Sequence, residues 1–280
     1  MNDPTDGLLI GVIGAGRAGP SVASALRANG NSIYGVAARS ESGRERVAAM
    51  LPGVPVKSAQ VVAAGADVVI LAVPDGQIHR VAEELSQMWR PGQLVLHLSG
   101  AVSLEALQPA MDRGALVASI HPAMTFSGTS LDVKRLQGAA VALTGSQFVL
   151  PLAEALARDL GGFPFEVRDI DKPLYHAALV HGANHLVTVL SQARDLLLDI
   201  GVADPAQVLR PLVSAAVEGA LEDGMGALTG PVARGDQETV DAHLVALEGS
   251  ETKDTYRWLS RATTNEWERH VAQEEEDAWS

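Results

Sequence analysis

A glycine-rich segment near the start of the chain constrains the fold more than any other feature. Residues 14–19 match the pattern G-x-G-x-x-G, with an apolar run over residues 8–13 before them and an alanine-rich stretch over residues 20–28 after them. A strand, a glycine turn and a helix in this order predict the first βαβ unit of a Rossmann fold, whose helix N-terminus offers free N–H groups to a pyrophosphate. The residues expected to hold that pyrophosphate are Gly14, Ala15, Gly16, Arg17, Ala18 and Gly19. The alternative is an ordinary glycine-rich turn between a strand and a helix.

The alternation of short apolar runs and helical patterns continues through the first half of the chain. Further strands are predicted near residues 32–38, 54–56, 67–73, 94–98, 116–120, 139–143 and 165–167. Such alternation is typical of a parallel, doubly wound sheet covered by helices on both faces. After residue 168 only helical patterns remain. We therefore expect an α/β chain with a Rossmann domain over residues 1–168, followed by a smaller all-helical domain over residues 169–280.

Composition and charge exclude several classes of function. The 280 residues include 21 Lys and Arg against 34 Asp and Glu, a net charge of −13, which disfavours nucleic-acid and anionic-membrane partners. The absence of cysteine excludes disulfides, a thiolate nucleophile and thiolate metal ligands, and we predict no metal site. No apolar run approaches the roughly 20 residues of a membrane span, and the N-terminus is acidic rather than basic. We expect a cytoplasmic protein.

The residues at the end of the second predicted strand favour NADP over NAD. An NAD site usually places Asp or Glu about 20 residues after the glycine motif, where the carboxylate binds the ribose hydroxyls. This chain has Arg39 and Ser40 there. Arginine can bind a 2′-phosphate through paired charged hydrogen bonds, whereas a carboxylate would repel it. Arg17 adds a second cation, and the alternative is that Arg39 is only a solvated strand-end residue.

Three further predicted strands end in residues suited to the ligand edge of the sheet, because ligands of open α/β sheets bind beyond the carboxyl ends of strands. They are Val73, Pro74 and Asp75 after one strand, Ser99 and Gly100 after the next, and His121 after a third. We expect the first two groups to line the cofactor. His121 could reach the nicotinamide or substrate, or it could be a turn histidine bonded to local backbone.

A long helical pattern over residues 173–199 carries the second set of candidates. At about 100° per residue, His176, His181, Asn184 and Thr188 fall on one arc, and apolar residues fall on the other. Neutral hydrogen-bonding groups of this kind suit either a catalytic face beside the dinucleotide or polar contacts within an interface.

A polar loop in the second half contributes two more candidates. Arg234 could bind a substrate carboxylate through paired hydrogen bonds or form a surface salt bridge. Asp236 precedes a helical run, so it is a candidate substrate contact whose simpler interpretation is a helix N-cap.

Several segments together resemble one bacterial family, the Rossmann-like proteins with a C-terminal domain of unknown function 2520, within the 6-phosphogluconate-dehydrogenase-like superfamily. They are the Gly14–Gly19 loop, Ala72-Val73-Pro74-Asp75, Ile120-His121-Pro122, Tyr175-His176-Ala-Ala, and Leu228-Thr-Gly-Pro-x-x-Arg234-Gly-Asp236-x-x-Thr239-Val-x-x-His243-Leu. The resemblance implies NADP-dependent oxidoreduction and a helical domain that forms a homodimer. Some relatives are linked to ketopantoate reduction.

The chain departs from ketopantoate reductases at one point. Those enzymes carry a catalytic lysine followed by asparagines four and eight residues later. Aligning the second asparagine with Asn184 places His176 at the lysine position and Val180 at the first asparagine. Lys172, one turn earlier, is a candidate substitute. The histidine-proline pair at His121 is also similar to prephenate and arogenate dehydrogenases.

We therefore predict an NADP-dependent oxidoreductase that transfers hydride between nicotinamide and a small, anionic carbonyl substrate such as ketopantoate. In this hypothesis His176 is the general acid, Asn184 orients the carbonyl and Arg234 holds the carboxylate. The rival proton donors are His121 and Lys172, while His181, Thr188 and Asp236 complete the substrate site. The alternatives are a non-catalytic NADP-binding regulatory protein, a prephenate-like dehydrogenase, and a deazaflavin reductase.

Overall fold

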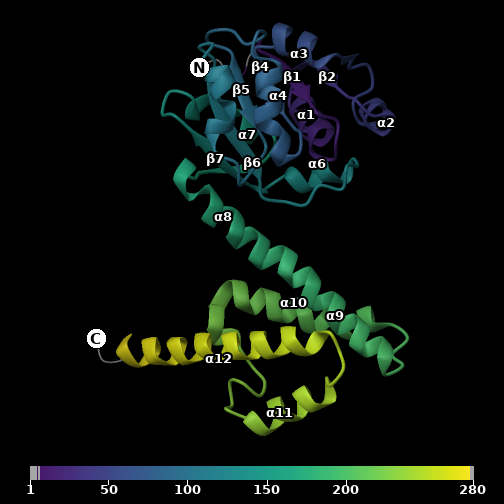
Figure 1. Cartoon of the computed structure of the whole chain (residues 1–280), viewed down its shortest axis with the longest axis vertical. Coiled ribbons are helices and arrows are strands. Elements are labelled where there is room, and N and C mark those ends of the chain that lie inside the picture. Colours follow the sequence, from purple (N-terminus) through teal and green to yellow (C-terminus); the bar gives the residue numbers. More distant parts are fainter. Residues whose placement is uncertain (1–4, 6, 278–280) are drawn as a thin grey trace. The chain divides into compact units, whose positions relative to one another are not determined.

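The computed structural model describes residue 5 and residues 7–277, so most of the acidic N-terminus lies outside the described residues. The chain divides into two compact units, residues 1–182 and 183–280, and each is described by itself (Figure 1). The last strand ends at Glu166, close to the predicted change of pattern at residue 168. The compact first unit continues beyond that point, and the predicted domain boundary stays a prediction.

The first unit is built on a single eight-stranded sheet in the order β3-β2-β1-β4-β5-β6-β7-β8. The strands are β1 (Leu9–Ile13), β2 (Ser32–Ala37), β3 (Val56–Lys57), β4 (Val68–Leu71), β5 (Leu94–His97), β6 (Leu116–Pro122), β7 (Ala140–Gly145) and β8 (Phe163–Glu166). Adjacent strands are parallel except for the antiparallel pair β6 and β7. The predicted Rossmann-type sheet followed by helices is confirmed. The prediction that all strands are parallel is wrong for the pair β6 and β7.

Alternating strand side chains form two apolar cores, one on each face of the sheet. In β1, Ile10 and Val12 contribute to one core and Ile13 to the other. The first core packs against α1 (Ala18–Ala28), α2 (Glu41–Met50), α6 (Leu131–Leu136) and α7 (Leu150–Asp159). The second packs against α3 (Ala59–Gly65), α4 (Ile78–Glu84) and α5 (Gln108–Met111). Burial on both faces explains why the strands are continuously apolar.

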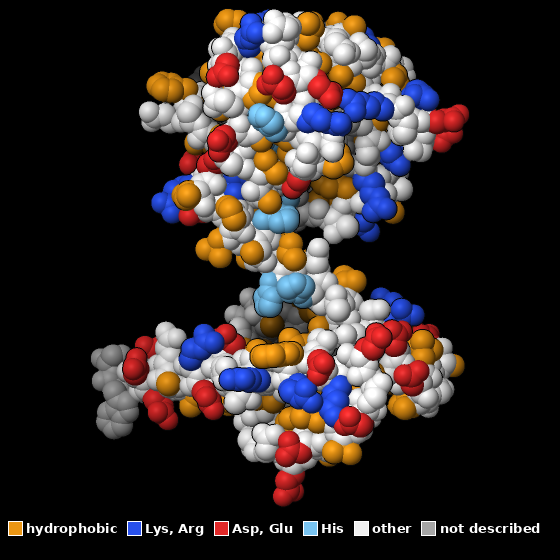
Figure 2. Space-filling model, viewed as in Figure 1, with side chains coloured by type: hydrophobic (Ala, Val, Ile, Leu, Met, Phe, Trp, Pro, Cys, Tyr) orange, Lys and Arg blue, Asp and Glu red, His pale blue; other side chains and the backbone are white. Residues whose placement is uncertain are grey.

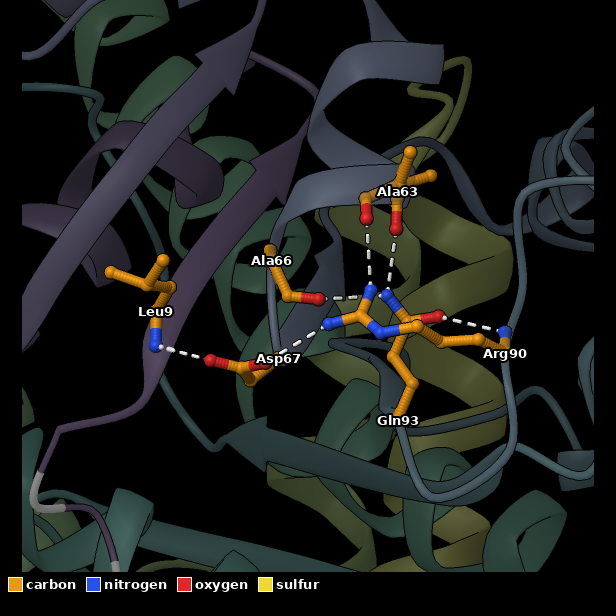
Figure 3. A network of polar contacts seen from close by, with 7 residues as sticks. Leu9, Ala63, Ala66, Asp67, Arg90 and Gln93 are labelled. Atoms are coloured by element: carbon orange, nitrogen blue, oxygen red, sulfur yellow. Dashed lines mark hydrogen bonds and ion pairs between the residues drawn. The ribbon is translucent and has the colours of Figure 1, made fainter.

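A network of polar contacts stabilises the edge of the sheet at which β1, β4 and β5 begin (Figure 3). The Asp67 carboxylate accepts hydrogen bonds from the Leu9 N–H at 3.1 Å and from Arg90 Nη2 at 2.9 Å. The Gln93 amide donates to two carbonyl oxygens at the end of α3, at 2.7 and 2.8 Å. These bonds satisfy carbonyls that a helix end leaves without intrahelical partners, so this edge is fixed by paired groups.

A helical segment joins the end of the sheet to the second unit. It consists of α8 (Lys172–Leu179), a π-helical turn (Val180–Asn184) and α9 (His185–Asp199). The prediction of an uninterrupted α-helix over residues 173–199 is wrong at this turn. A π-turn holds more residues than an α-turn, so the predicted 100° spacing does not carry from His176 to Thr188.

The second unit contains the remaining helices and buries few side chains. They are α10 (Pro205–Asp223), α11 (Gln237–Ala246) and α12 (Thr252–Asp277). Among the described residues from 183 onward, only Pro205, Val240 and Leu247 are buried. Exposed large side chains include Leu212 and Trp258, each 67% exposed. Within residues 5 and 7–277, no helix combines the length and hydropathy that a membrane crossing needs.

Candidate active site

The glycine loop between β1 and α1 has the geometry that its sequence pattern predicts. Gly14 has a φ of +117°, and a Cβ there would lie 2.2 Å from the Ala72 carbonyl oxygen. A Cβ at Gly19 would lie 2.1 Å from the Gly14 carbonyl oxygen, so α1 packs too closely for a side chain. A Cβ at Gly16 would meet nothing within 4 Å, which leaves open space beside the loop. The loop therefore fits a pyrophosphate approaching its backbone.

A cleft of about 570 Å³ opens beside this loop, at the carboxyl ends of β1, β2 and β4. Its polar lining includes Arg39, Ser40, Ser42, Arg46 and Lys57, and none of its lining residues is an Asp or Glu. Val73 and Pro74 form part of its wall, and their contact with a cofactor stays a prediction. Three cations and three serine hydroxyls, the third from Ser58, line the cleft without a carboxylate, and this lining suits a ligand that carries an additional phosphate.

The two arginines of the cleft have different partners. Arg39 is 74% exposed and pairs with Glu84 at 3.2 Å, so its guanidinium lies at the mouth of the cleft. Arg46 Nη1 donates to the carbonyl oxygens of Ala15 at 2.7 Å and Gly16 at 3.3 Å. Arg46 was not predicted as a site residue, because nothing in the sequence distinguishes it from other surface arginines of a helix.

The charges of the cleft are local rather than part of a broad basic surface. On the face shown in Figure 2, Lys and Arg side chains are interspersed with Asp and Glu side chains in both units. The chain as a whole carries a net charge of −13. An anionic ligand would therefore be held by the placed groups of the cleft and not by the overall field.

The predicted rim residues Asp75 and Ser99 contact each other. Ser99 Oγ donates to Asp75 Oδ2 at 2.7 Å and accepts from the backbone N–H groups of Ala101 at 3.2 Å and Val102 at 3.0 Å. Asp75 directly follows Pro74 of the cleft wall. The cleft wall is thus joined to a second polar cluster at the ends of β5 and β6.

Lys172, at the start of α8, forms the centre of this cluster. Its side chain is buried, and Nζ donates to the Ser99 carbonyl oxygen at 3.0 Å and to Ser119 Oγ at 2.6 Å. Burial lowers the pKa of Lys172 to about 8, although the carboxylates of Asp169 and Asp75 act in the opposite direction. A buried amine with a lowered pKa is a candidate for proton transfer or charge stabilisation.

His121, on β6, contacts residues of α8, and the charge of Lys172 affects its pKa. Its Nδ1 hydrogen-bonds to the Tyr175 hydroxyl at 2.9 Å, and its ring centre lies 6.2 Å from that of His176. Burial, and then the positive charges of His176 and Lys172, lower the pKa of His121 to about 4. A Cβ at Gly100 would lie 2.8 Å from the imidazole, so only glycine fits there. The alternative of a turn histidine bonded to local backbone is wrong, because the partner is Tyr175.

The sequence analysis also missed His97, the last residue of β5. His97 is fully buried, and its Nδ1 accepts from the Ser99 N–H at 3.1 Å. Its Nε2 is buried without a hydrogen-bond partner among the described residues. Burial, followed by the charge of Lys172, lowers its pKa to about 3. The one available signal was a histidine within an otherwise apolar strand.

Most of the remaining predicted site residues lie in the second unit. Asn184, Thr188, Arg234 and Asp236 belong to the second unit. Both Asp236 carboxylate oxygens accept from Thr239, from its N–H at 3.0 Å and its hydroxyl at 2.7 Å, so Asp236 is the N-cap of α11. His181 lies in the π-turn and is exposed. Roles for these residues in substrate binding stay predictions.

Two family models match the chain. A Rossmann-like domain matches residues 4–122, and a domain of unknown function, DUF2520, matches residues 139–263. No curated protein matches the chain.

Several solved structures share the fold. A proposed NADP oxidoreductase from Bacteroides fragilis has a TM-score of 0.77 and 21% identity, covering 92% of this chain and 98% of that one. A Thermotoga maritima protein has a TM-score of 0.71 and 22% identity, covering 95% and 99%. A pyrroline-5-carboxylate reductase from Coxiella burnetii has a TM-score of 0.57 and 22% identity, covering 96% and 98%. At these identities the likeness shows the fold alone.

Proposed function

Since this chain belongs to the proteins that join a Rossmann-like domain to a DUF2520 domain, we propose that it is an NADP-dependent oxidoreductase acting on a small carbonyl compound. The cleft beside the glycine loop carries the proposal, because it offers cations and hydroxyls to phosphates and no acid among its lining residues. The names of the Bacteroides and Coxiella proteins, an NADP oxidoreductase and a reductase, favour the same class of reaction.

The preference for NADP over NAD rests on Arg39 and its neighbours. Arg39, Ser40 and Lys57 line the part of the cleft that follows β2 and β3. NAD-binding sites place a carboxylate at the end of the second strand, where it binds the ribose hydroxyls. Here Arg39 binds the 2′-phosphate instead, with its ion pair to Glu84 exchanged for the phosphate on binding.

A bound nicotinamide dinucleotide supplies the hydride, and the chain's own residues hold the substrate and its proton. Tyr175 keeps its proton, because burial raises the pKa of its hydroxyl to about 12. We infer that the hydroxyl is the donor to Nδ1 of the neutral His121, so that the imidazole proton lies on Nε2. This Nε2–H donates a hydrogen bond to the carbonyl oxygen of the substrate.

Lys172 and His176 provide charge and a proton at the same edge. Below about pH 8 the Lys172 ammonium is protonated and stabilises the negative charge that develops on the substrate oxygen. His176, half-buried beside His121, delivers the proton to that oxygen as general acid.

The proposed substrate is a 2-oxo acid of the ketopantoate type. The substrate-facing cluster holds a buried cation, and both nearby acids are engaged, Asp75 by Ser99 and Asp169 by the Ser103 hydroxyl and the Leu104 N–H. An anionic carbonyl compound is therefore favoured over a cationic one. Asn184 and Arg234 belong to the second unit, and their roles in orienting the carbonyl and binding the carboxylate stay predictions from the sequence.

The proposed assembly is a homodimer through the helical unit. With only Pro205, Val240 and Leu247 buried among the described residues from 183 onward, this unit leaves much apolar surface in water. Large exposed apolar patches mark interaction surfaces in stable proteins. Sedimentation of the whole chain tests this: we expect twice the chain mass of 29.3 kDa, and a monomer at micromolar concentration would contradict it.

The test of the function is NADPH oxidation with a panel of 2-oxo acids, followed at 340 nm. We expect turnover with at least one member, transfer of a single hydrogen from one face of the nicotinamide, and little turnover with NADH. Binding of NADPH without turnover on any carbonyl or imine compound would contradict catalysis and favour a regulatory NADP-binding protein.

A further inference from the structure

A buried carboxylate on the far side of the glycine loop is used by none of the chemistry above. Asp132, in α6, is 0% exposed. Its Oδ1 accepts from the Ser127 N–H at 3.0 Å and the Ser127 hydroxyl at 2.7 Å. Its Oδ2 accepts from the Gly128 N–H at 2.7 Å and the Ser21 hydroxyl at 2.9 Å. Four donors thus converge on one carboxylate.

These contacts connect two segments that are far apart in the sequence. Ser21 lies in the first turn of α1, and its hydroxyl also lies 2.8 Å from the carbonyl oxygen of Arg17, within the glycine loop. Ser127 and Gly128 belong to the turn between β6 and α6. Asp132 therefore fastens that turn to the N-terminal end of α1, where the proposed pyrophosphate site lies.

The fastened turn packs directly on the cations of that site. Gly128 has a φ of +78°, and a Cβ there would lie 3.0 Å from Arg46 Nε and 3.1 Å from Arg17 Cγ. Arg46 in turn donates to the carbonyl oxygens of Ala15 and Gly16. The Gly128 backbone thus limits the positions that the two guanidinium-bearing side chains can take beside the glycine loop.

Asp132 keeps its charge in this position. Burial by itself would raise the pKa of the carboxyl, but hydrogen bonds from Ser127, Gly128 and Ser21 outweigh it and hold the pKa below its ordinary value. The nearest cation, Arg135, is 3.9 Å away and 56% exposed. Four hydrogen bonds, and not a close ion pair, therefore stabilise the buried charge.

We propose that Asp132 is a positioning residue for the dinucleotide pyrophosphate, because it holds the Ser127–Gly128 turn against Arg17 and Arg46 beside the glycine loop. The inference rests on the proposed NADP site. The pyrophosphate is common to NADPH and NADH, whereas the 2′-phosphate is not. Loss of Asp132 should therefore weaken both cofactors by the same factor, while loss of Arg39 should weaken NADPH alone.

The substitution Asp132→Asn tests this at one defined contact. Asn can still accept from Ser127 through its oxygen and can donate to the Ser21 hydroxyl, but its NH₂ group faces the Gly128 N–H, donor against donor. The matched control is Asp159→Asn in the same unit. Asp159 Oδ2 accepts from Thr5 Oγ1 at 3.0 Å and from Asn31 at 2.7 Å, and Asp159 does not line the cofactor cleft.

Binding of NADPH and NADH to the full chain is measured by nicotinamide fluorescence, with thermal unfolding recorded for each variant. We expect Asp132→Asn to weaken both cofactors about tenfold with an unchanged NADPH/NADH ratio, and Asp159→Asn to bind as the wild type does. If Asp132→Asn fails to fold, Ser127→Ala and Ser21→Ala each remove one hydroxyl bond, and we expect about twofold to threefold weaker binding.

Three results would overturn the inference, and they are distinguishable from one another. A wild-type chain that binds both cofactors, with folded Asp132 or serine variants that bind them equally well, contradicts the role of Asp132 alone. A wild-type chain that binds neither cofactor contradicts the proposed function and this inference with it. A changed NADPH/NADH ratio in Asp132→Asn would also contradict a role at the pyrophosphate.

Discussion

The two edges of the sheet hold polar networks of opposite character. At the edge where β1, β4 and β5 begin, Asp67 and Arg90 form an ion pair at 2.9 Å, with each side chain partly exposed (Figure 3). At the opposite edge Lys172 is buried, and its Nζ donates to a carbonyl oxygen and a hydroxyl oxygen, neither of which carries a negative charge. At the first edge Asp67 and Arg90 neutralise each other and stay partly hydrated, so their desolvation free energy is small. At the second edge the Lys172 ammonium is buried, and burial disfavours its charged form.

The difference extends to the groups that titrate. At the carboxyl edge burial lowers the pKa of Lys172 to about 8, that of His121 to about 4 and that of His97 to about 3. Groups shifted in this way gather at functional sites, because stability alone does not require them. The comparison therefore predicts that substitutions at the carboxyl edge reduce turnover and those at the amino edge reduce stability.

The largest effect is expected from Lys172→Met, which removes the buried charge and keeps much of the side-chain volume. We expect kcat to fall about 1,000-fold, because the developing charge on the substrate oxygen loses its stabilising cation. Steady-state kinetics with NADPH and the substrate found in the panel measure this. A folded Lys172→Met variant with more than a tenth of wild-type kcat would remove Lys172 from the mechanism.

The pH dependence of the wild-type kcat is a second test of the role of Lys172. The protonated Lys172 is the active form, so we expect kcat to fall about tenfold per pH unit above a pKa of about 8. The free energy of unfolding should change with pH in the opposite direction. Between about pH 8 and the ordinary lysine value of 10.5 the unfolded chain binds one more proton than the folded one, so the free energy of unfolding rises with pH.

This opposition between rate and stability is checked by chemical denaturation across the window, with Lys172→Met as the reference. The variant should lack the component of the stability rise that belongs to Lys172. A rise of equal size in both chains would mean that another group is responsible.

His121→Asn should lower kcat by about 100-fold, because the hydrogen-bond donor to the substrate oxygen is displaced.

Tyr175→Phe, which leaves the imidazole but removes its partner at 2.9 Å, should lower kcat about tenfold. The kcat values of His121→Asn and Tyr175→Phe at saturating NADPH distinguish the loss of the His121 hydrogen bond to substrate from a change in the orientation of His121. Equal kcat for Tyr175→Phe and the wild type would show that the Tyr175 hydroxyl does not position His121.

Arg39→Ala probes the adenosine end of the same edge. We expect NADPH to bind about tenfold more weakly and NADH almost unchanged, because only NADPH carries the 2′-phosphate. Fluorescence titrations of both cofactors measure the ratio. An equal loss for both would place Arg39 elsewhere in the site.

The smallest effect is expected from Arg90→Met at the amino edge. The free energy of unfolding should fall by about 1 kcal/mol, because the partly exposed bonds to Asp67 and to a carbonyl of α3 are lost. The kcat value should stay at the wild-type level. A tenfold loss of kcat without a loss of stability would break the distinction between the two edges.

Sequence reasoning was strongest where local chemistry decides the outcome. The glycine loop, the eight strands and the helix cap at Asp236 follow from short-range patterns, and the structure shows each of them. The loop is predictable because Gly14 and Gly19 sit where a Cβ would collide with nearby backbone. The antiparallel pairing of β6 and β7 was not predictable in this way, since it depends on distant segments.

The candidate site was predicted less completely for the same reason. Our hypothesis chose His176 as the general acid because it lies on the polar arc of a helical pattern, and that pattern contains an unforeseen π-turn at Val180–Asn184. The burial of Lys172 follows from strands β5 and β6, which lie more than 50 residues earlier in the chain. Arg46 and Asp132 reach the glycine loop and α1 through contacts with Ala15 and Ser21, which lie 31 and 111 residues away in the chain. No local pattern marks these two contacts, whereas His97 had the weak signal of a histidine within an apolar strand.

The most direct test of the account is titration calorimetry of the whole chain with NADPH and with NADH. We expect both to bind at a single site per chain, with NADPH about tenfold tighter because of its 2′-phosphate. Equal affinities would contradict the assignment to NADP. Absence of heat with either cofactor, oxidised or reduced, would contradict the nucleotide site on which the proposed function depends.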